Sequence, residues 1–129
     1  MNDRDFNLVI VSDLHLSQGW DPQTRRLPPH EDFFFDDAFA RFLAALDAES
    51  RNCGRKWRLI VAGDMVDFLQ VLSLPAEGLF PLRSRERAYG LGTSVAKTIW
   101  KLQVIMAGHK VFFRALARFL AAGHRLTVI

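Results

Sequence analysis

The chain has 129 residues, which is the size of one ordinary domain and too short for two. Half of the residues are hydrophobic and 24% are charged, so the composition favours a packed core over an intrinsically disordered chain. The formal net charge of +3 is too small to predict a specific nucleic-acid partner. No apolar run approaches the roughly 20 residues of a transmembrane helix, so we expect no membrane span.

The cysteine content and the N-terminus indicate the compartment. Cys53 is the only cysteine, which excludes an intrachain disulfide and a zinc site built from cysteines. The first residues carry Asp3 and Asp5 and lack the basic start and the cleavage pattern of a secretory signal. We therefore expect a cytoplasmic protein.

Three apolar runs in the sequence are typical of β-strands. Phe6–Ser12 and Trp57–Ala62 are mostly apolar and contain several β-branched residues, and Leu126–Ile129 begins a third such run. Runs of this kind are usual for strands that are buried on both faces of a parallel sheet. The sequence therefore predicts three strands, of which the first, Phe6–Ser12, is expected to be buried on both faces.

Helical patterns separate these strands. From Phe35 onward, apolar residues recur every three to four positions until a stop at Gly54. Leu69–Leu82 is irregular. A long apolar stripe then predicts a helix that bends or breaks near Gly108 and is capped by Gly123. Its members are Ile99, Leu102, Ile105, Met106, Phe112, Phe113, Leu116, Phe119 and Leu120. The order β-α-β-α-β predicts an α/β fold with a parallel sheet and right-handed crossovers.

The first strand is followed by a triplet with metal-binding residue types. Asp13 and His15 come directly after it, and residues two apart on an extended chain point the same way, so both side chains can reach one point. A carboxylate and an imidazole together suit a divalent transition metal such as Mn, Fe or Zn. The structural alternative is a simple turn, because Asp and His are common at strand ends.

A second acidic motif, G-D-M-V-D, begins at Gly63 after the second strand. Gly63 lets the backbone pass close to a bound ion, and Asp64 is expected at the same sheet edge as Asp13. Open parallel sheets bind ligands outside the carboxyl ends of their strands, so these residues and His15 predict one shared site. The alternatives are that Asp64 caps the next turn and that Asp67 is a solvated carboxylate.

Together the two motifs resemble those of the calcineurin-like metallophosphoesterases. That family places D-x-H after one apolar strand and G-D-x-x-D after the next, with a helix between them, as this chain does at Asp13 and Asp64. The resemblance implies that Asp13 and His15 bind a first metal, that Asp64 bridges two metals, and that Asp67 orients ligand groups. It also implies that the chain is the N-terminal β-α-β-α-β half of an α/β/β/α sandwich.

The same resemblance implies an enzyme that hydrolyses phosphoesters with two divalent ions (Mn, Fe or Zn). A hydroxide would attack phosphorus in line while the ions neutralise charge on the phosphoryl oxygens. The substrate would be a phosphorylated small molecule or a phosphodiester. The family's later G-N-H-[DE] and G-H-x-H motifs are absent from residues 1–129. We therefore expect one incomplete domain, part of a longer enzyme, that is inactive by itself and self-associates.

The sequence also allows a second function. The alternative function is a non-catalytic α/β binding module with a vestigial site for a single ion. Residues downstream of Ile129 would distinguish the two functions. Among the remaining histidines, the pattern predicts an exposed loop for His30, a helix interior or a helix junction for His109, and a surface turn for His124. The alternating arginines of Arg83–Arg87 suit either a phosphate clamp or a solvated charge run.

Overall fold

The computed structural model describes residues 5–129. The backbone divides into two compact units. The first unit contains the described residues up to 15 together with 35–65 and 110–129, and the second contains 16–34 and 66–109. Each unit is therefore assembled from segments that are far apart in the sequence.

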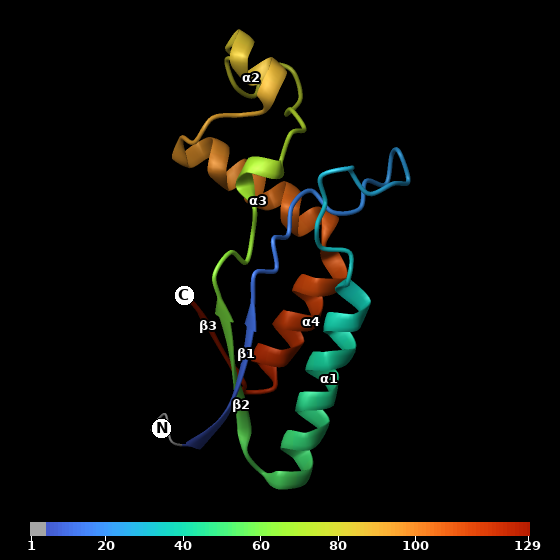
Figure 1. The fold of residues 1–129 in the computed structure, drawn as a ribbon, viewed down its shortest axis with the longest axis vertical. Coiled ribbons are helices and arrows are strands. Elements are labelled where there is room, and N and C mark those ends of the chain that lie inside the picture. The colour runs from blue at the N-terminus through green and yellow to red at the C-terminus, as the bar shows by residue number, and fades with distance from the viewer. Residues whose placement is uncertain (1–4) are drawn as a thin grey trace. The chain divides into compact units, whose positions relative to one another are not determined.

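The first unit is built on a three-stranded parallel sheet (Figure 1). The strands are β1 (Phe6–Ser12), β2 (Lys56–Ala62) and β3 (Arg125–Val128), with β2 in the centre. In the register of β1 and β2, Val9 pairs with Leu59. The predicted parallel α/β arrangement is confirmed, and the predicted strand bounds agree with the structure to within one residue.

Two helices of the same unit, α1 (Asp36–Cys53) and α4 (Lys110–Ala121), pack on one face of this sheet (Figure 1). Helix α1 carries Asp36 and Asp37 in its first turn, where the positive end of the helix dipole favours negative charge. It ends at Gly54, whose φ of 75° closes the helix in a left-handed cap. The local signals predicted both ends of this helix.

The core of the first unit lies between the helices and the sheet. Leu59 and Val61 of β2 are 0% and 1% exposed, and Phe112 of α4 is 0% exposed. The rings of Phe112 and Phe39 stack with their centroids 4.1 Å apart. Burial of such large side chains is the main stabilising contribution to a small α/β unit.

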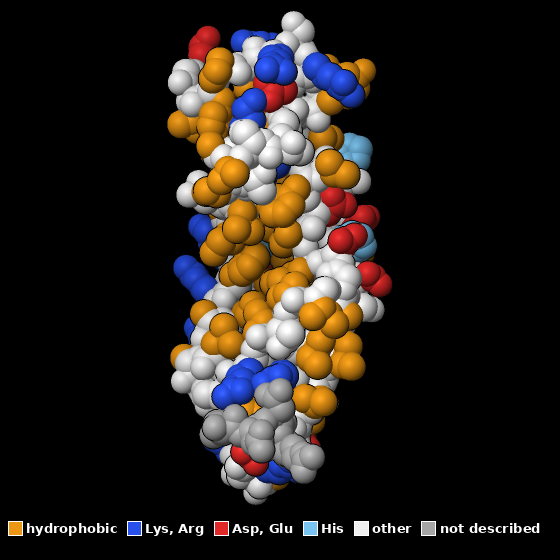
Figure 2. All heavy atoms as spheres, turned by 90° about the vertical axis from the view of Figure 1, so that its left-hand side faces the viewer, with side chains coloured by type: hydrophobic (Ala, Val, Ile, Leu, Met, Phe, Trp, Pro, Cys, Tyr) orange, Lys and Arg blue, Asp and Glu red, His pale blue; other side chains and the backbone are white. Residues whose placement is uncertain are grey.

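The opposite face of the sheet is open in the part of the chain that the structure describes. Leu8 and Ile10 of β1 are 59% and 65% exposed, and hydrophobic side chains gather over this face (Figure 2). The prediction that β1 is buried on both faces is therefore wrong, because only alternate side chains point toward the helices. An open apolar face favours association at about 25 cal/mol per Å² buried, so self-association stays a prediction.

The second unit contains a 3-10 helix, η2 (Phe68–Gln70), and two α-helices, α2 (Ser84–Tyr89) and α3 (Val95–Gly108). Helix α2 is not predicted by the sequence, because the alternating arginines of this stretch suit either a phosphate clamp or a solvated charge run. The helix forms because the carboxylate of Glu86 turns back onto the N-terminus of α2 and accepts a hydrogen bond of 3.0 Å from the backbone N–H of Arg83. A short helix of this kind has too few residues to show an apolar period.

Glu86 is also an anchor for neighbouring segments of the second unit. Its carboxylate accepts a second backbone hydrogen bond of 2.9 Å from Gly92 and forms an ion pair with Lys97. The ammonium group of Lys97 and these hydrogen bonds lower the pKa of Glu86 to about 2. The acidic residue within the arginine run is therefore structural, whereas Arg83 and Arg85 are exposed.

The long apolar stripe of the sequence belongs to two separate helices. Helix α3 ends at Gly108 and α4 begins at Lys110, so the predicted break is confirmed. Ile105 and Phe112 are fully buried, but Ile99 is 53% exposed. The apolar stripe is therefore buried only in part, and its buried members lie on two separate helices.

Candidate metal centre

The two acidic motifs leave neighbouring strands and are hydrogen-bonded to each other. The backbone N–H of Asp13 donates to the carbonyl oxygen of Ala62 over 3.2 Å, and the N–H of His15 donates to that of Asp64 over 3.0 Å. The pairing of β1 with β2 thus continues beyond the sheet. Asp13 and Asp64 lie at the same sheet edge, as the sequence predicts.

The backbone at the first motif is not extended. Asp13 and His15 have φ angles of 52° and 51°, in the left-handed region, and within residues 5–129 Arg25 is the only other non-glycine residue with a positive φ. The argument that their side chains point the same way along an extended chain is therefore wrong. Left-handed backbone costs about 1–3 kcal/mol at such residues and is often found at binding sites.

Gly63 leaves room for the carboxylate of Asp13. Its φ is 80°, and a Cβ at this position would overlap Oδ1 of Asp13. The N–H of Gly63 also donates a hydrogen bond of 2.8 Å to the carbonyl oxygen of Ile129, the residue that follows β3. Any larger residue at position 63 would displace the carboxylate of Asp13. The close approach of the two motifs therefore requires a glycine at this position.

The side chains of the candidate ligands are open to solvent. Asp13 and Asp64 are exposed, and His15 is partly exposed. Among residues 5–129, no group of three or more His, Cys, Asp or Glu side chains is placed so that it could hold a metal ion. The backbone thus brings the two motifs to one edge, while their side chains are not gathered around a single point.

Asp67 has a capping role in the second unit. Its Oδ1 accepts hydrogen bonds from the backbone N–H groups of Leu69 and Gln70, at 3.0 and 3.3 Å, and caps the N-terminus of η2. The N–H of Asp67 donates to the carbonyl oxygen of Leu16 over 2.8 Å. The capping residue is therefore Asp67 and not Asp64, and the alternative in which Asp67 is a purely solvated carboxylate is wrong.

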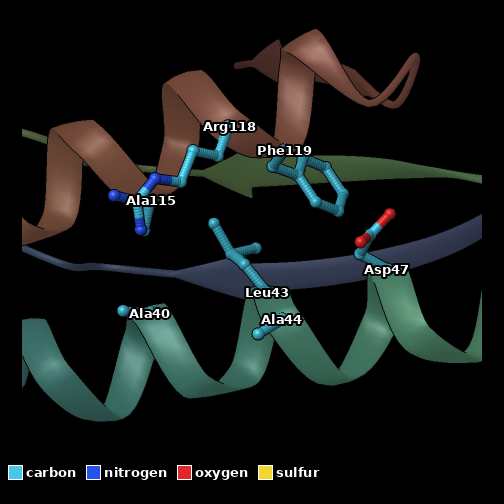
Figure 3. Close-up of a pocket in the computed structure, with 7 residues that line it drawn as sticks. All are labelled: Ala40, Leu43, Ala44, Asp47, Ala115, Arg118 and Phe119. Carbon is cyan, nitrogen blue, oxygen red and sulfur yellow. The ribbon is translucent and has the colours of Figure 1, made fainter.

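A groove of about 180 Å³ lies between α1 and α4 in the first unit (Figure 3). Ala40 of α1 and Ala115 of α4 face each other across it, and Asp47 lies toward one end (Figure 3). Its lining residues are Ala40, Leu43, Ala44, Asp47, Ala115, Arg118 and Phe119. None of the candidate metal ligands is among them, so the groove is separate from the site at the sheet edge.

His124 is buried, and its prediction as a surface residue is wrong. The residue is 4% exposed, and its ring stacks on Phe119 with a centroid distance of 4.2 Å. The backbone N–H of Trp57 donates to Nδ1 over 3.1 Å, so the ring proton is on Nε2, which lies 3.1 Å from Oδ1 of Asp47. Hydrogen bonding from His124, together with Arg51, lowers the pKa of Asp47.

His124→Phe is expected to destabilise the first unit by about 1–3 kcal/mol. The substitution keeps an aromatic ring against Phe119 but leaves the N–H of Trp57 without its acceptor. Urea unfolding followed by fluorescence in a Trp20→Phe, Trp100→Phe background would report on this unit. The control is Glu49→Gln, at an exposed position of α1 in the same unit, which is expected to change stability by less than about 0.5 kcal/mol. Equal effects of both substitutions would contradict a structural role of His124.

The two other histidines lie as predicted, and one acidic residue was missed. His30 is exposed, and His109 is 1% exposed at the C-cap of α3. The missed residue is Glu31, which is 8% exposed. No local pattern distinguishes it from the neighbouring Asp32, which is exposed.

In the described part of the chain, no helix has the length and apolar character needed to cross a membrane.

The candidate metal centre is identified from its geometry and from its two sequence motifs. Comparisons with protein-family models, with curated proteins and with solved structures found no match to this chain.

Proposed function

We propose that this chain supplies part of the metal centre of a phosphoester hydrolase of the calcineurin-like metallophosphoesterase type. Asp13 and His15 would bind one divalent ion, and Asp64 would bridge this ion to a second one. The observation that carries the proposal is the hydrogen bond between the backbones of His15 and Asp64 at the carboxyl edge of a parallel sheet. The resemblance of the two motifs supports the same assignment.

The donor set fits a divalent transition metal. Two carboxylates and one imidazole are ligands that Mn, Fe and Zn accept, and Gly63 leaves the carboxylate of Asp13 unobstructed on one side. When bound, such ions would supply Lewis acidity, activating a water and neutralising charge on a phosphoryl group. The residues of this chain would hold the ions and position them, and groups beyond these three are needed to complete two coordination shells.

Asp67 is proposed to act outside the ligand set. Its carboxylate already accepts hydrogen bonds from the backbone of Leu69 and Gln70, which suits a residue that orders the backbone after the second motif. The proposed substrates are phosphorylated small molecules or phosphodiesters. A cytoplasmic location remains part of this proposal.

Residues 1–129 by themselves are expected to bind Mn²⁺ weakly and to hydrolyse no phosphoester. Three protein ligands hold one ion loosely and do not complete a dinuclear site. Mn²⁺ titrations followed by electron paramagnetic resonance would measure binding, and Asp13→Asn and Asp64→Asn should each reduce it at least about tenfold. The control Glu49→Gln removes one charge from an exposed position of α1 and should leave binding unchanged.

Two results would contradict this prediction. Turnover of a generic aryl phosphate by the purified chain, lost on addition of a chelator, would show that the three ligands suffice. Mn²⁺ binding that is unaffected by both Asp13→Asn and Asp64→Asn would place the ion elsewhere and remove the proposed site.

A further inference from the structure

Helix α3 of the second unit (Figure 1) has two charged residues, and neither is on its exposed face. Lys101 is 4% exposed, and the side chain of Lys97 is 17% exposed. The ammonium group of Lys97 forms an ion pair with Glu86, within the same unit. Burial lowers the pKa of Lys101, and the charge of the Glu86 carboxylate opposes this shift. A surface helix normally turns its charged side chains to solvent, so α3 is reversed with respect to charge.

The exposed face of α3 is apolar. Four large hydrophobic residues there are 77%, 53%, 36% and 45% exposed, namely Val95, Ile99, Leu102 and Met106. They are spaced by four, three and four positions, which is the spacing of the a and d positions in a coiled-coil heptad. Ile105 is 0% exposed, so the buried side of the helix is a different one. A contiguous apolar row of this kind is typical of an interaction surface.

The positions beside this row are uncharged as well. Ala96, Gln103 and Ala107 are exposed next to it. The exposed face of α3 from residue 95 to residue 107 therefore carries no charged side chain. A charged partner would find no complementary charge on this face. Two copies of the face, in contrast, would bring no like charges together when they meet.

Two kinds of apolar occupant remain, a lipid surface and another helix. Helices that bind a lipid surface carry exposed Lys or Arg on their polar face, where these residues attract anionic headgroups. In α3 the two lysines are turned toward Glu86 instead. A second helix with the same heptad spacing matches the row of α3 by knobs-into-holes packing, and another copy of this chain supplies such a helix.

We propose that α3 is a dimerisation helix, which packs its exposed apolar face against α3 of a second copy of this chain. The contact is isologous, so one two-fold axis closes it and leaves no exposed half for further copies. It is separate from the open sheet face, which belongs to the first unit. A pair of helices that are each 14 residues long is a small interface, so the dimer is expected to be weak. The proposal does not depend on the candidate metal centre.

The test measures the dimer Kd of the 129-residue chain by analytical ultracentrifugation in an Ile10→Glu background. Ile10 is 65% exposed on β1, and a charge there suppresses association through the open sheet face. Adding Ile99→Glu is expected to raise the Kd at least about 100-fold, because the substitution occurs once in each copy and each buried position contributes about tenfold. The matched control is Val111→Glu, which places the same charge at an exposed β-branched position of α4 and should leave the Kd unchanged.

Four results would overturn the proposal. The first is an Ile10→Glu chain that stays monomeric at every concentration. The second is a Kd that Ile99→Glu does not change, and the third is an equal rise for Val111→Glu. The fourth is a monomeric chain that binds phosphatidylcholine vesicles until Ile99→Glu is introduced, which would assign the face to lipid. Should circular dichroism show that Ile99→Glu does not fold, Ile99→Ala takes its place, and a smaller rise in Kd supports the proposal whereas no rise overturns it.

Discussion

In a complete enzyme of the proposed type that contains this chain, Asp64→Asn is expected to remove both metal ions and to reduce kcat by more than about 100-fold, above the range seen for residues that only orient a ligand. The substitution removes a negative charge and barely alters the side-chain volume. Asp64 is exposed, so the fold should survive. If this carboxylate bridges two ions, both sites lose a ligand at once.

Two further variants test whether Asp64 differs from His15 and Asp67 in contacting both ions. His15→Asn should weaken one ion more than the other, because only Asp64 is proposed to contact both. Asp67→Asn should reduce affinity about 10–100-fold, since its carboxylate caps η2 and is proposed to act outside the ligand set. Metal content per chain, kcat and circular dichroism would be measured for all three. Two ions and near-normal turnover in Asp64→Asn would disprove the bridging role.

The second unit is expected to lose stability in acid through Glu31. Burial by itself would raise its pKa from the ordinary 4.5, but hydrogen bonds from His109, Gly19 and Ser17 lower it to about 2. A carboxyl group whose pKa is lowered by folding stabilises the fold above its unfolded pKa, and this contribution is lost as the pH falls toward the folded pKa. The difference corresponds to a contribution on the order of 3 kcal/mol, present above about pH 5 and decreasing between about pH 4.5 and 2.

The measurement is the stability difference between wild type and Glu31→Gln at several pH values. In a Trp57→Phe background the remaining tryptophans, Trp20 and Trp100, lie in the second unit, so fluorescence during urea unfolding reports on it. The difference should be largest near neutral pH and shrink as the pH falls below 4.5. Glu49→Gln, at an exposed position, is the control with no expected pH dependence. A stability difference between wild type and Glu31→Gln that stays constant from pH 7 to pH 3 would show that the ionised carboxylate of Glu31 does not stabilise the fold.

The sequence predicted where the candidate metal site lies. It did not predict the backbone geometry of the site. Asp13 and Asp64 each follow a strand that local patterns identify, and parallel strands bring their carboxyl ends to one edge. The left-handed backbone of Asp13 and His15 has no counterpart in a motif, because it depends on hydrogen bonds to another strand. The contact between Gly63 and Asp13 likewise joins residues that are far apart in the chain.

By itself the sequence determined the elements whose signals are local. The apolar run of β1, the acidic first turn of α1 and the glycine that ends α1 act over a few residues, so they can be recognised without the fold. The roles of Glu31 and His124 were decided by tertiary structure alone. Glu31 is buried by donors from three separate segments, and His124 by Trp57 and Asp47. A polar side chain is stable in a core only when distant parts of the chain supply its partners, and no local pattern records which parts will meet.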